Sequence, residues 1–395
     1  MKYALIIPDG AADVPLEELG GKTPLEVARI PNIDWIAAQG KVGTVRNIPE
    51  GMPAGSDVAI LSVLGYDPRE CYTGRAPLEA AAQGLKVRPD ELVFRCNFVT
   101  IVEGVMEDYS AGHISTEEAQ ALIDELNRQL AGDTVQFYCG VSYRHLMTYA
   151  ASCDLKTTPP HDILSKPTEP YLPAGAGCEP IRELMKRSEA LLGEHEINAI
   201  RRELGDNPAT SIWLWGEGHM PVLPSFADKY GKRGSAITAV DLVRGIASLI
   251  GWRRIDVQGA TGFVDTNYAG KGAAAVEALD DCDIVCVHVE APDESGHNAD
   301  PAGKITAMEA IDRDIVGPVL ERLRAEGDEW RICVLPDHPT PCTLRTHTRD
   351  PVPFAIAGKR IQHVVPNVFT ERSAAESDLH IDRGCTLMEF LLTVR

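Results

Sequence analysis

The chain has 395 residues, of which 44% are hydrophobic, and it carries a formal net charge of −20. A chain of this length and apolar content can bury the cores of two domains. The negative charge repels nucleic acid and anionic membranes, so we expect neither as a partner, and an anionic substrate has to be held by local cations.

No stretch of the sequence has the pattern of a signal peptide or a membrane span. The first apolar run is five residues long and ends before a proline and Asp9, and no apolar stretch is long enough to cross a bilayer. The ten cysteines form no CxxC pair. We therefore expect a cytoplasmic protein with reduced thiols, without a zinc ribbon or disulfide framework. Nothing in the sequence specifies an oligomeric state.

The N-terminal part contains a strand, a helix and a candidate nucleophile. Residues 3–7 predict a buried strand that ends before Asp9, and residues 24–39 have the apolar spacing of a helix with Thr23 as N-cap. Ser56 lies at or near the start of the next helix. Ser followed by Asp is a common helix start, which is the ordinary explanation. The functional explanation is a nucleophile placed where helix amides hold a phosphate.

The middle of the chain has a different pattern, in which strands and helices suggest an α+β module. The expected elements are strands at 92–102, 105–109, 135–141, 145–150 and 211–214, and helices at 115–130 and 181–204. We therefore treat residues 82–228 as an inserted domain between residues 1–81 and 229–395.

Strands and helices alternate in the C-terminal part. The expected strands are 236–240, 254–257, 284–289 and 332–335, and the expected helices are 241–250, 268–279, 306–323 and 387–393. This alternation is typical of a largely parallel sheet covered by helices on both faces. The predicted fold class is therefore α/β, interrupted by the inserted α+β domain.

Three of the expected strands are followed by carboxylate and imidazole side chains. These are Asp9 after 3–7, Asp293 and His297 after 284–289, and Asp337, His338 and His347 after 332–335. Ligands of open α/β sheets gather beyond the carboxyl ends of the strands, so these residues predict a metal site. We expect a tight loop over 293–297, with Gly296 permitting the turn. The alternative for the last group is a proline-rich surface loop with incidental histidines.

Seven motifs occur in a characteristic order along the chain. They are PDG at 8–10, GSD at 55–57, GATG at 259–262, TNY at 266–268, VHVEAPDESGH at 287–297, PDH at 336–338 and HT…PVPF at 347–354. Together they resemble the cofactor-independent, that is 2,3-bisphosphoglycerate-independent, phosphoglycerate mutases. The resemblance is to the compact archaeal-type branch within the alkaline phosphatase superfamily, and it runs from residue 1 to the C-terminus.

The resemblance implies interconversion of 2- and 3-phosphoglycerate through a phosphoserine at Ser56, at a site with two divalent metal ions. Mixed carboxylate and imidazole ligands favour manganese, with magnesium and zinc as alternatives. By the resemblance, Asp293, His297 and His347 hold one ion, and Asp9, Ser56, Asp337 and His338 hold the other.

The resemblance also assigns a role to the inserted domain, which would close over the small phosphorylated substrate and exclude water. Its candidate clamps for carboxylate and phosphate are Arg95, His113, Arg144 and His145, although each could be a solvated surface residue. Lys271, in the metal-binding part, follows TNY where members of the family use a lysine near the phosphate.

One position departs from the archaeal-type pattern. Where that branch usually has arginine, this chain has His113, and its DYSAGHIST segment resembles a bacterial branch proposed to act as a homoserine kinase. Two alternatives to a mutase therefore stay open: a phosphotransferase on another small hydroxyl compound, or a phosphate-ester hydrolase. A third is a metal-binding protein without enzymatic activity. The chain has no Walker A loop, so any use of ATP would have to pass through the phosphoserine.

Overall fold

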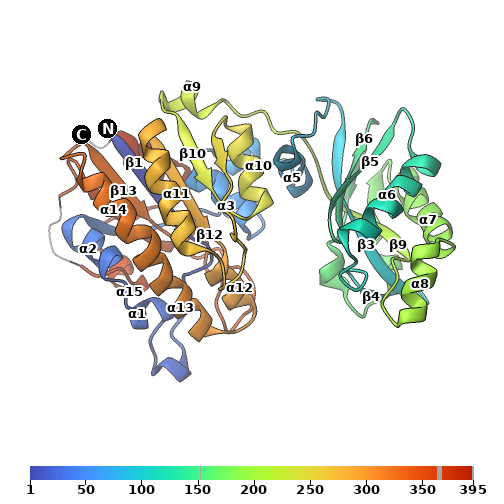
Figure 1. The fold of residues 1–395 in the computed structure, drawn as a ribbon, viewed down its shortest axis with the longest axis horizontal. Helices are drawn as coiled ribbons and strands as arrows, with labels where there is room; N and C mark the ends of the chain where they lie inside the picture. Colours follow the sequence, from blue (N-terminus) through green and yellow to red (C-terminus); the bar gives the residue numbers. More distant parts are fainter. Residues whose placement is uncertain (152, 363–366, 394–395) are drawn as a thin grey trace. The chain divides into compact units, whose positions relative to one another are not determined.

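The computed structural model shows two compact units (Figure 1). The first comprises Met1–Tyr72 and Val222–Arg395, and the second comprises Thr73–Pro221. The structure describes residues 1–151, 153–362 and 367–393.

The second unit starts and ends earlier than the predicted insertion over 82–228. The helix α5 (Arg75–Gln83) was expected to belong to the first part of the chain. Instead, its residues Ala76 and Ala80 pack with Val93 and Leu146 in an apolar cluster of the second unit. Burial of this helix face explains why the boundary lies before α5.

The first unit is built on an eight-stranded sheet with the order β11-β10-β12-β1-β13-β14-β2-β15. Five neighbouring strands, from β11 to β13, are parallel, and β14 runs antiparallel to both of its neighbours. In sheet order the strands are Arg253–Ile255, Gly234–Ile237, Ile284–Val289, Lys2–Pro8, Trp330–Val334, Val352–Gly358, Lys41–Val45 and His380–Ile381.

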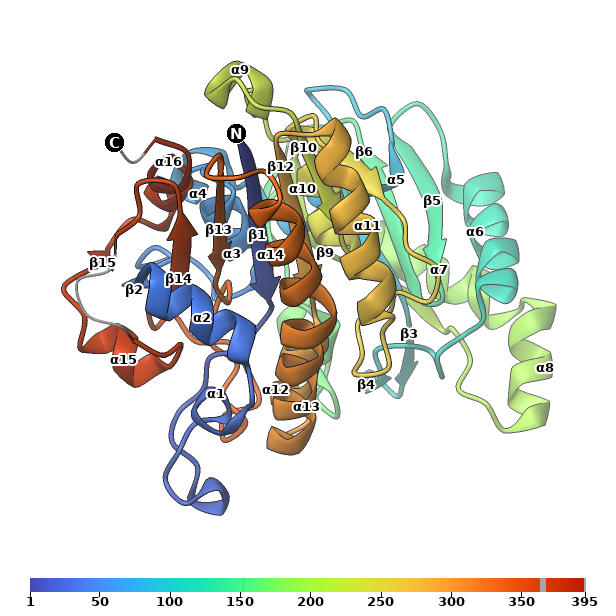
Figure 2. The same ribbon diagram turned by 60° about the vertical axis from the view of Figure 1, so that its left-hand side comes forward.

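Helices cover both faces of this sheet (Figure 2). One face packs against α2, α11, α13 and α14, whose apolar residues form one core with the strands, and the other face carries α3, α10 and α16. The helices are α1 (Pro24–Val27), α2 (Pro31–Gln39), α3 (Ser56–Val63), α4 (Pro68–Cys71), α9 (Phe226–Tyr230), α10 (Asp241–Leu249), α11 (Tyr268–Asp281), α12 (Ala291–His297), α13 (Pro301–Ile311), α14 (Gly317–Arg324), α15 (Glu371–Ala375) and α16 (Leu387–Thr393). The predicted α/β fold with a largely parallel sheet is confirmed.

Two expected helices are each divided in the structure. The helix expected over 24–39 is α1 and α2, because the residue before a proline is disfavoured in helical conformation and Pro31 restarts the chain as α2. The helix expected over 181–204 is α7 (Glu179–Gly193) and α8 (Glu196–Leu204), with His195 as the N-cap of the second.

The second unit is an antiparallel sheet with helices packed on it. Its main strands follow the order β4-β3-β6-β5, and β9 pairs with β3. They are β3 (Leu92–Val102), β4 (Val105–Asp108), β5 (Val135–Val141), β6 (Arg144–Tyr149) and β9 (Ser211–His219), with α6 (Thr116–Leu130) as the helix opened by the capping box at Ser115. A separate small ribbon pairs β7 (Asp154–Lys156) with β8 (Ala174–Ala176).

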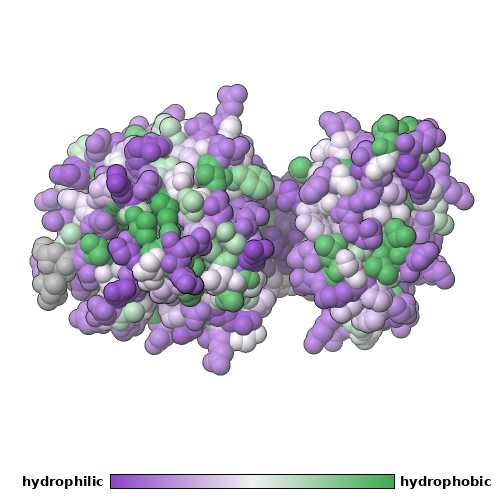
Figure 3. All heavy atoms as spheres, turned by 90° about the horizontal axis from the view of Figure 1, so that it is seen from below, coloured by the Kyte–Doolittle hydropathy of each residue, from purple (hydrophilic) through white to green (hydrophobic). Residues whose placement is uncertain are grey.

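The surface and the cysteines agree with the composition. The face in Figure 3 is mostly hydrophilic, with small hydrophobic areas. All ten cysteines are free, as predicted. Within the described part of the chain, no helix combines the length and the apolar character that a membrane span requires.

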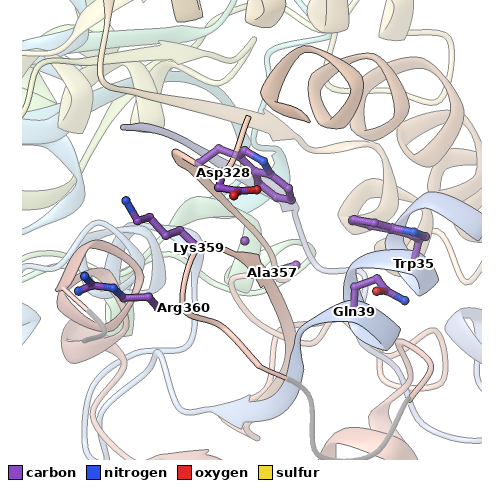
Figure 4. A pocket seen from close by; sticks show the side chains of 8 residues that line it. Trp35, Gln39, Asp328, Ala357, Lys359 and Arg360 are labelled. Carbon is purple, nitrogen blue, oxygen red and sulfur yellow. The ribbon is translucent and has the colours of Figure 1, made fainter. Parts of the chain in front are cut away.

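A hollow of about 440 Å³ lies at one edge of the large sheet (Figure 4). Its lining includes Trp330 at the start of β13 and Gly358 at the end of the antiparallel β14. The hollow therefore lies at the end of the sheet where the parallel strands begin. The predicted metal ligands follow the opposite ends of these strands. This hollow is therefore not part of the candidate site.

Candidate metal centre and nucleophile

The first group of predicted ligands lies on α12 and on the segment after β13. The loop expected over 293–297 is wrong, because Asp293 and His297 belong to the helix α12, where a spacing of four residues places them on one face. Gly296 is helical, and it serves close packing: a Cβ atom there would lie 2.3 Å from the carbonyl oxygen of Thr340. The spacing of the two ligands was informative, but the backbone conformation was not the one expected.

Asp293, His297 and His347 converge on one point. The Nε2 atoms of His297 and His347 lie 3.3 and 3.5 Å from the two Asp293 carboxylate oxygens and 3.0 Å from each other. The Nδ1 atom of His297 is 3.0 Å from the carbonyl oxygen of Arg345, and that of His347 is 3.3 Å from the carbonyl oxygen of Ala54. These carbonyls require a proton on each Nδ1, which leaves both Nε2 lone pairs facing the same space.

The charges in this group stabilise one another. Burial acts to raise the pKa of Asp293, but the imidazole groups of His297 and His347 beside it hold this pKa well below its ordinary value. The hydrogen bond to Asp293 raises the pKa of His297 to about 9. A proton on His297 therefore takes the place that a cation between the ligands would occupy.

Asp9, Asp337 and His338 form a second, fully buried group. The Nε2 atom of His338 lies 3.4 Å from Asp9 Oδ1 and 3.4 Å from Asp337 Oδ2. These two oxygens are buried and have no hydrogen-bond partner among the described residues. Burial, together with the charges of Asp337 and Asp293, raises the pKa of Asp9 well above its ordinary value. Unpaired buried carboxylate oxygens of this kind are what a divalent cation would satisfy.

Thr340 joins the two groups. Its hydroxyl donates a hydrogen bond to Asp293 Oδ1, and it lies 3.2 Å from His338 Nδ1. Because the hydroxyl proton is used on Asp293, Thr340 Oγ1 must accept the Nδ1 proton of His338, so that His338 Nε2 is unprotonated. Asp293 is also close enough to Asp9 and His338 to share a cation with them. The two groups thus form one continuous cluster.

Ser56 lies beside this cluster at the start of α3. Gly55 is the N-cap, and Ser56 is the first helical residue. The Ser56 Oγ atom lies 3.0 Å from His338 Nε2. Because Ser56 makes no N-cap hydrogen bond, the ordinary explanation of the Ser-Asp pair as a capping sequence does not apply to its hydroxyl. Its Oγ atom is instead directed at His338, one of the predicted metal ligands.

His288 was not among the predicted residues, although it lies within the VHVEAPDESGH motif. It is buried in β12, with Nε2 2.9 Å from Asp9 Oδ2 and Nδ1 3.2 Å from Thr238 Oγ1. Burial lowers the pKa of His288 to about 4, so the ring is neutral at pH 7. A histidine inside an apolar strand is usually a core residue, and only its contact with Asp9 shows that it orients a predicted metal ligand.

Lys271 is fully buried in α11 and lies near the same edge of the sheet. Its Nζ atom is 3.4 Å from the carbonyl oxygen of His288. Burial lowers the pKa of Lys271 to about 8, while the nearby charge of Glu290 acts to raise it. The side chain can therefore gain or lose a proton close to neutral pH.

The donor set fits divalent metal ions. Carboxylate oxygens and imidazole nitrogens with unprotonated Nε2 atoms suit manganese, zinc or iron, and the backbone and threonine contacts on Nδ1 fix the ring orientation. Gly10 allows the loop after β1 to approach, since a Cβ atom there would lie 2.5 Å from Asp293 Oδ1. The arrangement is therefore a candidate metal centre with a serine hydroxyl beside it.

Two of the four substrate-binding candidates in the second unit, His113 and Arg144, lie beside Tyr143. His113 has its ring centroid 5.9 Å from that of Tyr143, and the Arg144 guanidinium is 6.0 Å from the same ring. Arg95 is buried, 3.0 Å from Glu79 and stacked 4.2 Å from the ring centroid of Trp215. Burial lowers the pKa of Arg95 to about 10.

His145 is placed differently from its neighbour. Alternation along β6 turns Arg144 to the surface and His145 into the core. The Nδ1 atom of His145 accepts a hydrogen bond from the amide of Gly140 at 3.1 Å, and its ring packs edge-on against Phe98. Burial lowers the pKa of His145 to about 3, so it carries no positive charge at pH 7. The structure therefore does not bring His145 together with His113 and Arg144 beside Tyr143.

Comparisons with known proteins show the family of the chain. A family model described as 2,3-bisphosphoglycerate-independent phosphoglycerate mutase matches residues 37–198. A protein of this name from Methanosarcina acetivorans is 51% identical over 399 residues, covering all of both chains. Another from Methanothrix thermoacetophila is 49% identical and covers 99% of this chain and all of its own.

Solved structures agree with these relatives. A Pyrococcus horikoshii protein of 32% identity superposes with a TM-score of 0.83, covering 99% of this chain and 96% of its own. The cofactor-independent phosphoglycerate mutase of Thermoplasma acidophilum, at 27% identity, gives a TM-score of 0.68 and covers 99% of both chains. The similarity therefore extends over both units.

Proposed function

Since the chain belongs to the 2,3-bisphosphoglycerate-independent phosphoglycerate mutases, an assignment that rests on its full-length relatives, we propose that it performs the reaction of this family through Ser56. The enzyme interconverts 2-phosphoglycerate and 3-phosphoglycerate, a step of glycolysis and gluconeogenesis, which we place in the cytoplasm. The observation that carries the proposal for Ser56 is the position of its Oγ atom, 3.0 Å from His338 Nε2 within the cluster of acidic and imidazole side chains.

The proposed cofactors are two divalent metal ions, with manganese favoured over magnesium and zinc. Asp293, His297 and His347 would hold one ion, and Asp9, Asp337 and His338, together with Ser56, would hold the other. Bound there, the ions would supply positive charge that lowers the pKa of a hydroxyl and neutralises phosphate oxygens.

In the proposed mechanism, the Ser56 oxygen attacks the phosphorus atom of the bound phosphoglycerate. The bond from Ser56 Oγ to phosphorus forms as the ester bond to the substrate oxygen breaks, which leaves glycerate and phosphoserine. The proton lost by Ser56 balances the proton gained by the released hydroxyl. The other hydroxyl of glycerate then attacks the phosphoserine, and Ser56 is restored.

Lys271 is proposed to support this transfer from within the first unit. Its ammonium group lies beside the end of β12, the strand that carries His288 and leads to Asp293. A pKa of about 8 keeps it largely protonated at pH 7, so it can attract a phosphate oxygen and donate a proton.

The second unit is proposed to bind the carboxylate and phosphate groups and to exclude water from the phosphoserine. Arg144 is exposed and Arg95 is already paired with Glu79, so Arg144 is the better candidate for direct contact with the substrate. His113 lies beside Tyr143, as Arg144 does. His145, neutral and buried, is assigned to the core of this unit rather than to the substrate.

A coupled assay tests the proposed function. Purified enzyme loaded with manganese is given 3-phosphoglycerate without 2,3-bisphosphoglycerate, and formation of 2-phosphoglycerate is followed through enolase. We expect turnover in this assay and none when ATP and homoserine replace the phosphoglycerate. Phosphorylation of homoserine without mutase turnover would assign the chain to the other phosphotransfer reaction. Release of inorganic phosphate alone would make it a hydrolase.

A further inference from the structure

Lys304 is a fully buried lysine whose ammonium group connects two loops beneath the metal-binding cluster. It projects from α13, the helix that follows α12. Its Nζ atom donates to the carbonyl oxygens of Gly10 at 3.1 Å and Thr340 at 2.7 Å, and to Asp13 Oδ2 at 2.8 Å. An ammonium group has three donors, so all of its hydrogen-bonding capacity is used in these contacts.

Each loop held by Lys304 carries or orients a predicted ligand. The amide of Gly10, the residue after Asp9, donates to Asp337 Oδ1 at 3.2 Å. The hydroxyl of Thr340 donates to Asp293 Oδ1. Lys304 therefore fixes the carbonyl groups of two residues whose other polar groups hold aspartates in each half of the cluster.

Asp13 completes the connection from the side of the first loop. Its carboxylate receives the backbone amides of Val14 at 2.8 Å and Cys342 at 3.1 Å in addition to the Lys304 ammonium. Cys342 lies two residues after Thr340, in the loop after β13. The pair thus connects the loop after β1 to the loop after β13 at two places, through Lys304 between Gly10 and Thr340 and through Asp13 at Cys342.

Stability alone does not account for this pair. Both side chains are 0% exposed, and taking a lysine and an aspartate out of water costs several kcal/mol per ion before their attraction is counted. Apolar residues of similar volume are often at least as stabilising in such positions. What they could not provide is a set of directed hydrogen bonds that fixes two loops at the distance seen here.

We propose that Lys304 and Asp13 are positioning residues that set the separation between the two groups of metal-binding side chains. The inference rests on the proposed two-metal site. Neither residue touches the reacting atoms; the pair acts through Gly10 and Thr340 on Asp337 and Asp293. Supporting groups of this kind typically change metal affinity by about 10-fold to 100-fold when they are removed.

The test uses the full-length double variant Lys304→Met with Asp13→Asn. It removes both charges together, so no unpaired ion is left buried, and the asparagine side chain that replaces Asp13 can still accept the two amides. Metal-free protein is titrated with Mn²⁺, with free Mn²⁺ and the magnetic coupling between two bound ions measured by electron paramagnetic resonance. Circular dichroism and thermal unfolding show whether the variant is folded.

We expect wild type to bind two Mn²⁺ with a coupled spectrum. The folded double variant should bind the second ion at least about 10-fold more weakly and show changed or lost coupling. A matched control is Arg201→Met with Glu118→Gln in the second unit, where a buried arginine also joins one carboxylate to backbone carbonyls, here three of them. This control should lower the unfolding temperature while leaving Mn²⁺ binding and coupling unchanged.

Wild-type affinity and coupling in the folded double variant would overturn the inference. If the double variant does not fold, Lys304→Leu with Asp13→Asn decides in the same way, because it also removes both charges together and leaves no unpaired ion buried. If wild type itself binds no Mn²⁺, the proposed metal site is wrong, and this result is distinct from failure of the positioning role.

Discussion

The Nε2 atoms of His297 and His347 face each other at 3.0 Å, while the Nδ1 atom of each ring is turned to a backbone carbonyl. Two lone pairs at this distance repel unless a proton or a cation lies between them. In the metal-free protein the proton is on His297, because its hydrogen bond to Asp293 raises its pKa to about 9. Metal binding must displace that proton.

The first prediction is a pH dependence of stability that metal removes. A pKa raised from 6.5 to about 9 on folding adds stability that is complete below pH 6.5 and is lost as pH rises through about 9. The free energy of unfolding of metal-free protein should therefore fall between these pH values, and Mn²⁺ should reverse the fall. Chemical denaturation across this pH range, with chelator and with Mn²⁺, measures this.

His297→Gln separates this effect from other titrating groups. The variant should lose the part of the decline that belongs to His297, whereas His219→Gln in the second unit should keep it. An identical decline in wild type and His297→Gln would show that the proton is held elsewhere.

The second prediction concerns His288, which lies 2.9 Å from Asp9 Oδ2. His288→Asn should weaken Mn²⁺ binding by about 10-fold to 100-fold, because Asp9 loses the group that orients it. The matched control is His145→Asn, which replaces another buried, neutral strand histidine with no contact to a predicted ligand. Metal content after dialysis at limiting Mn²⁺ distinguishes them, and equal content in both variants would contradict the positioning of Asp9 by His288.

Periodicity along the chain was sufficient to predict the main strands of the first unit and the polar residues that follow them. Buried strands such as residues 3–7 and 284–289 have continuous apolar runs, and a polar residue directly after such a run must lie at the carboxyl edge of the sheet. Asp9 and Asp337 could therefore be found from sequence. The helix of Asp293 and His297 was not foreseen, because Gly296 suggests a turn unless one knows that Thr340 packs against it.

The residues that orient the ligands could not be found in this way. His288, Thr340 and Lys304 are buried polar residues. Their contacts with Asp9, Asp293 and Gly10 span 279, 47 and 294 positions of the chain. No local spacing encodes such contacts. The exposure of Arg144 and His145 could not be predicted from sequence either. The two basic residues are adjacent, and only the orientation of β6 decides which of them is exposed.

The third prediction concerns Arg144 as a contact for the substrate. A hydrogen bond to a charged group contributes about 1.5–3 kcal/mol, so Arg144→Gln should raise KM about 10-fold to 100-fold. A smaller change in kcat is expected if the contact is present in both ground state and transition state. Arg128→Gln, an exposed arginine of α6 in the same unit, is the control and should leave KM unchanged. Steady-state kinetics in both directions measure this, and an unchanged KM in Arg144→Gln would remove it from the substrate site.

The last prediction concerns Ser56, which separates the enzyme classes. Ser56→Ala should lower kcat by a factor on the order of 10⁴ or more, because it removes the oxygen proposed to carry the phosphoryl group. Stability should change by less than about 1 kcal/mol, since Gly55 is the N-cap and alanine is a good helix former. Ser62→Ala, in the same helix, is the control and should retain turnover.

Rapid quenching of wild type with labelled phosphoglycerate should place the label on the peptide that contains Ser56, with no label on that peptide in Ser56→Ala. Substantial mutase turnover in Ser56→Ala would exclude the covalent mechanism, because no other group in the proposed scheme holds the phosphoryl group between its two positions. A labelled Ser56 that releases only inorganic phosphate would keep the nucleophile but not the mutase. Water would then reach the phosphoserine faster than the second hydroxyl of glycerate, so the failure would lie in the exclusion of water and not in the chemistry of Ser56.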